Sequence, residues 1–314
     1  LSTKVILFPK RILVACMFIG IIAGILSSQV KVDVDFKSFF NEGTIIRDGM
    51  DFMDEKMGGY LNMVIKIEDN LKSPKVLKNI SNVQSEIEKY EKVSLSFSVS
   101  DIVKQMHKSI MDDNPSFETI PNSQEKVNNL FTVYSLSGDE KDFSAISNED
   151  YTKGLINVRL KSMSTESANK VVLSTENHLA QLFPKDTNYT ITGILVIIRD
   201  MAILLVKSSF LNIFSAIILI FAISWYFFKS YIWGILAVLP LSFAVLLNYG
   251  IMGVLDIKLS HVTAILSSII IGVGVDFAIH FVAQYKLRLK EGYSGNLTKK
   301  VISDVGFPIF LDAA

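Results

Sequence analysis

The sequence predicts a membrane-embedded α-helical bundle that carries a large external α+β domain. The 314 residues balance 31 Lys and Arg against 31 Asp and Glu, yet residues 208–285 contain only four of these 62 charges. That block and a second apolar run near the N-terminus are long enough to cross a lipid bilayer. The remaining residues have the charge density of a soluble domain. The chain is therefore a membrane protein with a water-exposed insertion, not an unusually apolar globular protein.

The composition excludes several classes of protein. The formal net charge is zero, so no excess of positive charge is available to neutralise phosphates, and no nucleic-acid partner is expected. A single cysteine excludes a disulfide framework and a cysteine-based zinc site. We expect no bound metal ion.

Four apolar stretches predict membrane-spanning helices: residues 12–28, 210–228, 234–255 and 262–283. The first follows Lys4, Lys10 and Arg11, as a signal peptide also would. The residues before its end fit a cleavage site poorly, which favours an uncleaved span.

The lysine and arginine residues around these stretches predict the orientation of the chain. Nine lie on the side of the N-terminus, counting Lys229 and the five after residue 285, whereas only Lys258 lies in the short link on the other side. The N-terminus and the segment from residue 286 onward are therefore expected in the cytoplasm. Residues 29–207 then lie on the periplasmic or extracellular side of the inner (plasma) membrane.

The external residues show two βαβ units. Strands are predicted over 60–68, 93–99, 154–162 and 187–192, and helices over 73–90 and 164–183. Residues 100–136 read as helical with breaks near Asn114-Pro115 and at Pro121, and residues 135–150 read as a polar loop. This order predicts a split-βαβ sandwich with helices on one face of a sheet.

The approach to the second span predicts one long helix over residues 194–228, which contain neither proline nor glycine. A bend near Ser208 and Ser209 is the alternative.

The external residues contain no plausible catalytic constellation, and no enzyme activity or cofactor is expected. His107 and His178 lie far apart in the sequence without a nucleophile or metal-ligand spacing near either. We expect both to be surface or helix-cap residues. In the third span, Asn248 and Tyr249 place polar atoms within or near the membrane.

Asp276 is the candidate functional residue, because it lies inside the fourth predicted span. A carboxylate in hydrocarbon costs at least about 2.5 kcal/mol, so it must be protonated, paired or turned to a polar cavity. Gly272 and Gly274 precede it and allow close approach of a neighbouring helix. His280 follows at i+4 on the same helix face. Asp276 and His280 thus form a candidate proton relay; the alternative is a fixed hydrogen bond that locks helices together.

The sequence GVGVDFAIHF in the fourth span resembles the Gly-x-Gly-x-Asp-Tyr/Phe signature of the resistance-nodulation-division superfamily. It is most similar to the hydrophobe/amphiphile exporters, which include mycobacterial lipid exporters, hopanoid transporters and Patched-like proteins. The segments VDVDFKSFF, RDGMDFMDEKMGGYLNMVIKIE and TGILVIIRDM extend the resemblance along the chain. Drug-efflux members usually have two adjacent acids in the fourth span, whereas Phe277 follows Asp276 here.

The resemblance implies twelve spans in two halves, each with an external porter domain. It assigns residues 1–28 to the cytoplasmic N-terminus and first span, 29–207 to the porter domain and 208–285 to spans two to four. Residues 286–314 would be a cytoplasmic amphipathic segment and the start of a fifth span. By the same resemblance Asp276 carries protons driven by the proton gradient, with Gly272 and Gly274 as helix-packing companions.

The implied function is the N-terminal half of a proton-driven exporter of lipids or other hydrophobic compounds. Its expected partners are the hydrophobic substrate, membrane lipids, a second half-transporter and other copies in an oligomer. The chain is then a truncated chain or a half-length polypeptide that pairs with another. A Patched-like sterol or lipid receptor and a proton-driven accessory of protein translocation are the alternatives.

Overall fold

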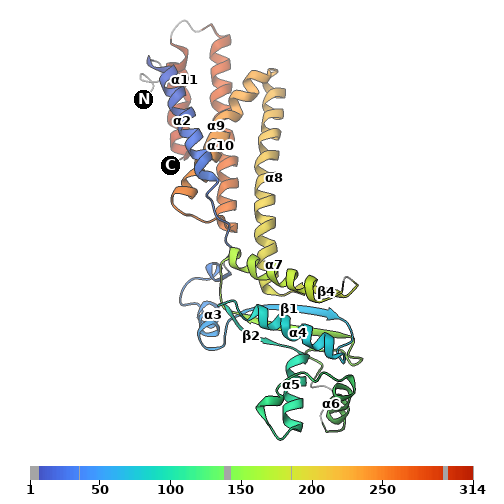
Figure 1. Ribbon diagram of the computed structural model, residues 1–314. Helices are drawn as coiled ribbons and strands as arrows, with labels where there is room; N and C mark the ends of the chain where they lie inside the picture. The colour runs from blue at the N-terminus through green and yellow to red at the C-terminus, as the bar shows by residue number, and fades with distance from the viewer. Residues whose placement is uncertain (1–6, 35, 138–142, 185, 293–295, 314) are drawn as a thin grey trace. The chain divides into compact units, whose positions relative to one another are not determined.

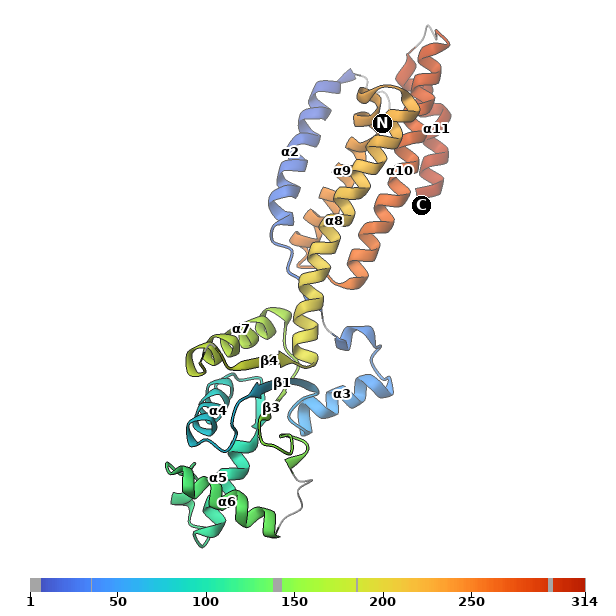
Figure 2. The ribbon, with the colours of Figure 1, turned by 90° about the vertical axis from the view of Figure 1, so that its right-hand side faces the viewer.

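The structure is a computed structural model that describes residues 7–34, 36–137, 143–184, 186–292 and 296–313. The chain folds into two compact units. The helical unit comprises Leu1–Asp33 with Ala202–Ala314, and the α+β unit comprises Val34–Met201. Figures 1 and 2 show the helices of the first unit and the sheet of the second.

Five helices contribute to the helical unit: α2 (Pro9–Ser27), the C-terminal part of α8 (Ile194–Phe228), α9 (Tyr231–Val254), α10 (His261–Lys290) and α11 (Leu297–Ala313). Among the described residues, α2, α8, α9 and α10 are long and apolar enough to cross a membrane, so each of the four predicted stretches lies in a helix of sufficient length. Helix α9 contacts α2 and α10, and α10 also contacts α11. Helix α10 extends past the predicted end of its span, where Arg288 Nη2 binds Asp304 Oδ2 of α11 at 2.8 Å.

Small residues bring α2 and α9 into backbone contact. A Cβ atom added at Gly253 would lie 2.1 Å from the carbonyl oxygen of Leu26, and one added at Gly250 would lie 2.8 Å from the Cα atom of Ala23. No side chain fits at either distance. Close approach of this kind stabilises helix pairs in lipid, where apolar burial gives no driving force between helices.

Helix α9 also forms the core between α8 and α10. Ile220 of α8, Val238, Leu241 and Val245 of α9, and Ile271 of α10 form one buried apolar cluster. Tyr249 packs against this cluster. Because α9 contacts α2, α8 and α10, it determines which face of α10 is covered.

Helix α8 has the bounds predicted from the sequence, Ile194–Phe228. Ser208 and Ser209 are helical, so the chain continues through the predicted alternative break. A helix of 35 residues is about 52 Å long at 1.5 Å per residue.

The α+β unit contains a four-stranded antiparallel sheet. Its strands are β1 (Leu61–Glu68), β2 (Val93–Phe97), β3 (Lys153–Leu160) and β4 (Asn188–Thr192), in the spatial order β2-β3-β1-β4. Leu61 pairs with Leu160, and Val64 lies between Asn157 of β3 and Thr192 of β4. The strands thus fall where the alternation of apolar residues predicts them.

Two helices cover one face of this sheet. Helices α4 (Pro74–Ile87) and α7 (Thr165–Leu182) contact each other and lie on the same side of the strands in Figure 2. Met63 and Ile65 of β1 point to this side and are fully buried, as are Leu77 of α4 and Leu179 of α7. The apolar residues that alternate along the strand and those that recur every three or four positions in the helices therefore share one core.

The helical region after β2 is interrupted where the sequence predicts. It comprises α5 (Val99–Ile110), a 3-10 turn at Pro115–Phe117 and α6 (Gln124–Ser137). The predicted polar loop overlaps the end of α6, residues 138–142 lie outside the described residues, and Ser147 pairs with Gly154 in a β-bridge.

One helix, α3 (Ile45–Lys56), lies in a stretch for which the sequence pattern predicts no element. Its apolar residues point outward, with Ile45 92% and Phe52 57% exposed. Its inner side carries Asp51 and Asp54, which both bind Lys37 Nζ, at 2.7 and 2.6 Å. The hydrogen bond from Lys37 holds the pKa of the Asp51 carboxyl below its ordinary value. Ion pairs therefore attach α3 to the α+β unit, whereas most helices are attached by buried apolar side chains.

Candidate functional site

Helix α10 begins at a well-formed cap. The Ser260 hydroxyl accepts from the Thr263 backbone N–H at 3.4 Å, and the Thr263 hydroxyl accepts from the Ser260 N–H at 2.8 Å. This reciprocal arrangement satisfies backbone donors that a helix start leaves without partners.

The loop before this cap is held by the segment that follows α2. Leu259 N–H donates to the Lys31 carbonyl at 2.8 Å, and Asp33 N–H donates to the Leu259 carbonyl at 3.2 Å. The Lys258 ammonium binds the Asp33 carboxylate at 2.5 Å, and the Asp33 side chain is only 12% exposed. The start of α10 is therefore fixed to the end of α2, a pairing between residues that are far apart in the sequence.

The inner face of α10 packs on α9. Ser267, Ile271, Ala278 and Val282 are buried and recur at intervals of four and seven residues, which places them on one face of the helix. A Cβ atom at Gly274 would lie 3.2 Å from Leu241 Cδ1, so this glycine lies against α9. Gly274 is one of the two predicted helix-packing residues.

The outer face of α10 carries the other predicted residues. Gly272, Asp276 and His280 recur every four residues and are exposed. A Cβ atom at Gly272 would have no neighbour within 4 Å. Within the described residues, neither Asp276 nor His280 makes a hydrogen bond or ion pair. The three residues thus share one exposed face, where the described residues provide no hydrogen-bond partner for Asp276 or His280 and no atom within 4 Å of a Cβ at Gly272.

This arrangement has a chemical consequence. Asp276 lies in an apolar helix, where an ionised carboxylate without a partner is unfavourable. The alternative in which Asp276 locks helices through a fixed hydrogen bond has no counterpart in the contacts of the described residues.

A hydrogen bond joins α9 and α10 inside the helical unit, and the sequence alone does not predict it. Asn248 Nδ2 of α9 donates to Ser267 Oγ of α10 at 3.0 Å, and Ser267 donates in turn to the Thr263 carbonyl at 2.9 Å. Asn248 stands out in an apolar span, whereas Ser267 does not. Polar residues in neighbouring spans often pair in this way, and that rule is the signal that finds the partner.

His107 and His178 of the α+β unit both lie beside other residues of that unit. The sequence predicts a surface or helix-cap position for His107. It lies in the last turn of α5, but its side chain is buried: its Nδ1 lies 2.7 Å from the Thr119 carbonyl oxygen, and its ring packs in a T-shaped contact with Phe117. The prediction of a surface position is wrong because the turn after α5 folds back over the ring. His178 is partly exposed and lies 3.7 Å from a Glu86 carboxylate oxygen. In the part of the chain that the structure describes, no three His, Cys, Asp or Glu residues are grouped to hold a metal ion.

Comparisons with known proteins place the fold. The chain is 25% identical over 297 residues to the membrane protein MJ1562 of Methanocaldococcus jannaschii, covering 90% of this chain and 73% of that protein. Its fold is similar to the cryo-EM structure of the hedgehog release protein Disp from the water bear Hypsibius dujardini, with a TM-score of 0.55 and 10% identity. This match covers 96% of the chain, which spans 42% of the length of the Disp chain.

The family assignment rests on a longer pattern than the fourth-span signature. The family model of the MMPL family matches residues 66–297, which is more than half of the chain and includes α8, α9 and α10. The matched range contains Gly272, Gly274, Asp276 and His280. The chain therefore belongs to the MMPL family.

Proposed function

We propose that the chain is the N-terminal half of a proton-driven exporter of lipids or other hydrophobic compounds, in which Asp276 carries the proton. The observation that carries the proposal is the exposed carboxylate of Asp276 on an open face of α10, where none of the described residues binds it. Membership of the MMPL family supports a transporter. The chain spans 42% of the length of the Disp chain, so its work with a second half or copy is part of the proposal.

In this proposal Asp276 alternates between two states. It is protonated and neutral while its face is shielded from water, because burial of an unpaired charge is costly. It releases the proton when the face opens toward a polar pathway or a charged partner. The proton gradient alone supplies the energy, with no cofactor. His280, one turn away, exchanges the proton with Asp276, and Gly272 leaves room for a helix of the second half.

The α+β unit is then the porter domain. The strand order β2-β3-β1-β4, with α4 and α7 on one face, supports the split-βαβ type. The excess of lysine and arginine at the N-terminus and after α10 supports a location of this unit on the periplasmic or extracellular side of the inner membrane. A hydrophobic substrate passes through this domain after leaving the membrane.

The test compares Asp276→Asn with the native protein in proteoliposomes that contain an NBD-labelled phospholipid, under an imposed pH gradient. The amide cannot carry a proton, so gradient-dependent movement of the labelled lipid should fall to the level of empty vesicles. Proton entry, followed with internal pyranine, should fall in parallel.

Asp256→Asn is the matched control. Asp256 is exposed in the α9–α10 loop, where it binds Lys31 at 3.3 Å, and its positive φ of 50° suits asparagine. This variant should move protons and lipid like the native protein. Unchanged gradient-dependent movement in Asp276→Asn would exclude the relay.

His280→Gln tests the second member of the relay. If His280 exchanges the proton with Asp276, this variant should change the pH dependence of proton entry as well as its rate. A reduced rate with an unchanged pH profile would assign His280 to packing instead.

A further inference from the structure

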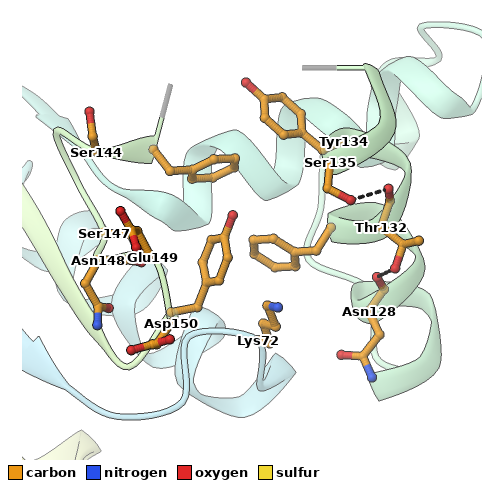
Figure 3. Close-up of a pocket in the computed structure, with 13 residues that line it drawn as sticks. Lys72, Asn128, Thr132, Tyr134, Ser135, Ser144, Ser147, Asn148, Glu149 and Asp150 are labelled. Atoms are coloured by element: carbon orange, nitrogen blue, oxygen red, sulfur yellow. Dashed lines mark hydrogen bonds between the residues drawn. The ribbon is translucent and has the colours of Figure 1, made fainter. Parts of the chain in front are cut away.

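The α+β unit contains a pocket of about 1080 Å³ that the transport proposal does not use. The β1–α4 loop, helix α6 and the segment before β3 form its walls (Figure 3). This volume lies just above the range of about 300 to 1,000 Å³ that is typical of sites for small organic molecules, so it has room for such a ligand.

Four aromatic rings form the inner wall of the pocket. Phe131 and Phe143 are 5% and 2% exposed, and their centroids lie 4.9 and 5.6 Å from that of Tyr151. Tyr134 meets Phe143 edge-on at 4.9 Å. Tyr134 and Tyr151 are only partly buried and line the pocket. The wall therefore offers aromatic surface to an organic ligand.

Lys72 adds a positive charge to this wall. Its Nζ lies 4.5 Å from the Tyr151 centroid and 5.5 Å from the Phe131 centroid. Within the described residues, its ammonium makes no ion pair or hydrogen bond. Glu149 and Asp150 also line the pocket, but neither carboxylate comes within 4 Å of Lys72 Nζ. The ammonium thus has ring faces beside it and N–H groups available for an oxygen ligand.

The backbone holds Tyr151 in an unfavourable conformation at this site. Its φ is +56°, a region that bulky side chains rarely adopt. Tyr151 N–H donates to the Asn148 carbonyl at 3.1 Å, and the Tyr151 carbonyl accepts from Leu71 N–H at 2.9 Å. Asn148 Oδ1 accepts from the next two N–H groups, those of Thr152 and Lys153. Strain of this kind is maintained by surrounding contacts and is frequent at binding sites.

We propose that this pocket binds an organic monoanion, whose charged oxygen group meets Lys72 and whose carbon skeleton lies on Tyr134 and Tyr151. A lysine ammonium binds carboxylate and phosphate oxygens as a point charge. Glu149 and Asp150 also line the pocket and repel every negative charge on a ligand, so one charge placed at Lys72 is less unfavourable than several. The anion can belong to a free metabolite or to the head group of an acidic lipid. The site does not depend on the relay at Asp276.

The test uses the full chain in phosphatidylcholine nanodiscs and isothermal titration with 2-naphthoate and its neutral counterpart 2-naphthamide. Naphthoate should bind at least about tenfold more tightly, since a hydrogen bond to a charged group contributes at least that factor. Lys72→Gln should remove the difference, and Lys72→Arg should keep most of it. Lys75→Gln removes the same charge from an exposed position that does not line the pocket and should bind like the native protein.

A second variant separates binding from folding. Tyr151→Asn removes the ring but keeps a residue that tolerates positive φ, so the backbone turn should persist while naphthoate affinity falls several-fold. Equal affinity for naphthoate and naphthamide, or unchanged naphthoate affinity in Lys72→Gln, would overturn the proposal. Displacement by both glycerophosphoglycerol and dihexanoyl phosphatidylglycerol would support a free anion as the source. Displacement by the lipid alone would support a lipid head group.

Discussion

Gln84 of the α+β unit and Asp276 of the helical unit differ in whether neighbouring residues provide hydrogen-bond partners. In the α+β unit Gln84 is 4% exposed, and its Oε1 accepts from the Ser98 and Ser100 hydroxyls at 2.8 and 2.7 Å. Its Nε2 donates to Asp101 Oδ2 at 2.6 Å. In the helical unit Asp276 has no such partner among the described residues. A polar group that stabilises one unit is satisfied inside it, whereas Asp276 is left open toward something outside it.

The glycines of the helical unit differ in the same way. Gly253 lies against the backbone of α2, and Gly272 faces open space on α10. Both are helical residues in apolar segments, and the sequence alone does not separate them. The contrast between closed and open positions therefore distinguishes packing residues from residues available to a partner.

The largest expected effect comes from adding one methyl group at the closed glycine. Gly253→Ala places a Cβ atom 2.1 Å from the Leu26 carbonyl oxygen, so α2 and α9 must separate and the unit should lose about 3 kcal/mol. Gly272→Ala gains the same helix propensity without a clash and should be neutral or stabilising. Both tryptophans, Trp225 and Trp233, lie in the helical unit, so their fluorescence during SDS titration measures its unfolding. Equal stabilities of the two variants would contradict the packing contrast.

A smaller effect is expected in the polar network of the α+β unit. Gln84→Leu leaves the buried Ser98 and Ser100 hydroxyls without their acceptor and should cost about 2 kcal/mol. Hydrogen exchange in β2 and α5 should accelerate correspondingly. Gln181→Leu, an exposed glutamine on α7, is the control and should leave exchange unchanged. Unaltered exchange in Gln84→Leu would show that the network is not stabilising.

A weaker effect is expected for the hydrogen bond between α9 and α10. Asn248→Leu removes the contact with Ser267 and should cost about 0.6 kcal/mol, the average for such bonds between membrane helices. Asn212→Leu changes an exposed position of α8 and should not destabilise the unit in the same SDS titration. A loss as large as that of Gly253→Ala would mean that polar contacts, not close packing, hold this unit together.

The smallest effect is a pH dependence at α3. The pKa of Asp51 is lowered in the folded state by the hydrogen bond from Lys37, so its contribution to stability is present above the unfolded value near 3.8. That contribution is lost as the pH falls through the lower, folded pKa. Hydrogen exchange of residues 45–56 should therefore accelerate only at pH values below about 3.8. In Asp51→Asn this acid-dependent step should shrink, and an identical step in both proteins would assign it to other groups.

Much of the fold follows from local pattern. The uninterrupted apolar runs predict the four long helices because lipid leaves the backbone no other hydrogen-bonding partner. Alternation of apolar residues, partial in β1 and strict in β2, predicts β1, β2 and β3. Pro115 and Pro121 mark where the helical region is interrupted. Local pattern fails at α3, because its apolar residues point outward and ion pairs with Lys37 hold its inner side. It fails at His107 because a distant turn covers the ring.

Local pattern predicts the apolar helices, the positions of the strands along the chain and Asp276 as a candidate residue, because it is a single acid in an apolar helix. Which face of α10 is covered, which glycine packs against backbone and where Asn248 finds its partner depend on tertiary packing. The same holds for the pocket, where Lys72 meets Tyr151 from a distant part of the sequence. The physical reason is that chain composition sets burial and helix length locally, whereas pairing between distant residues depends on how whole elements pack.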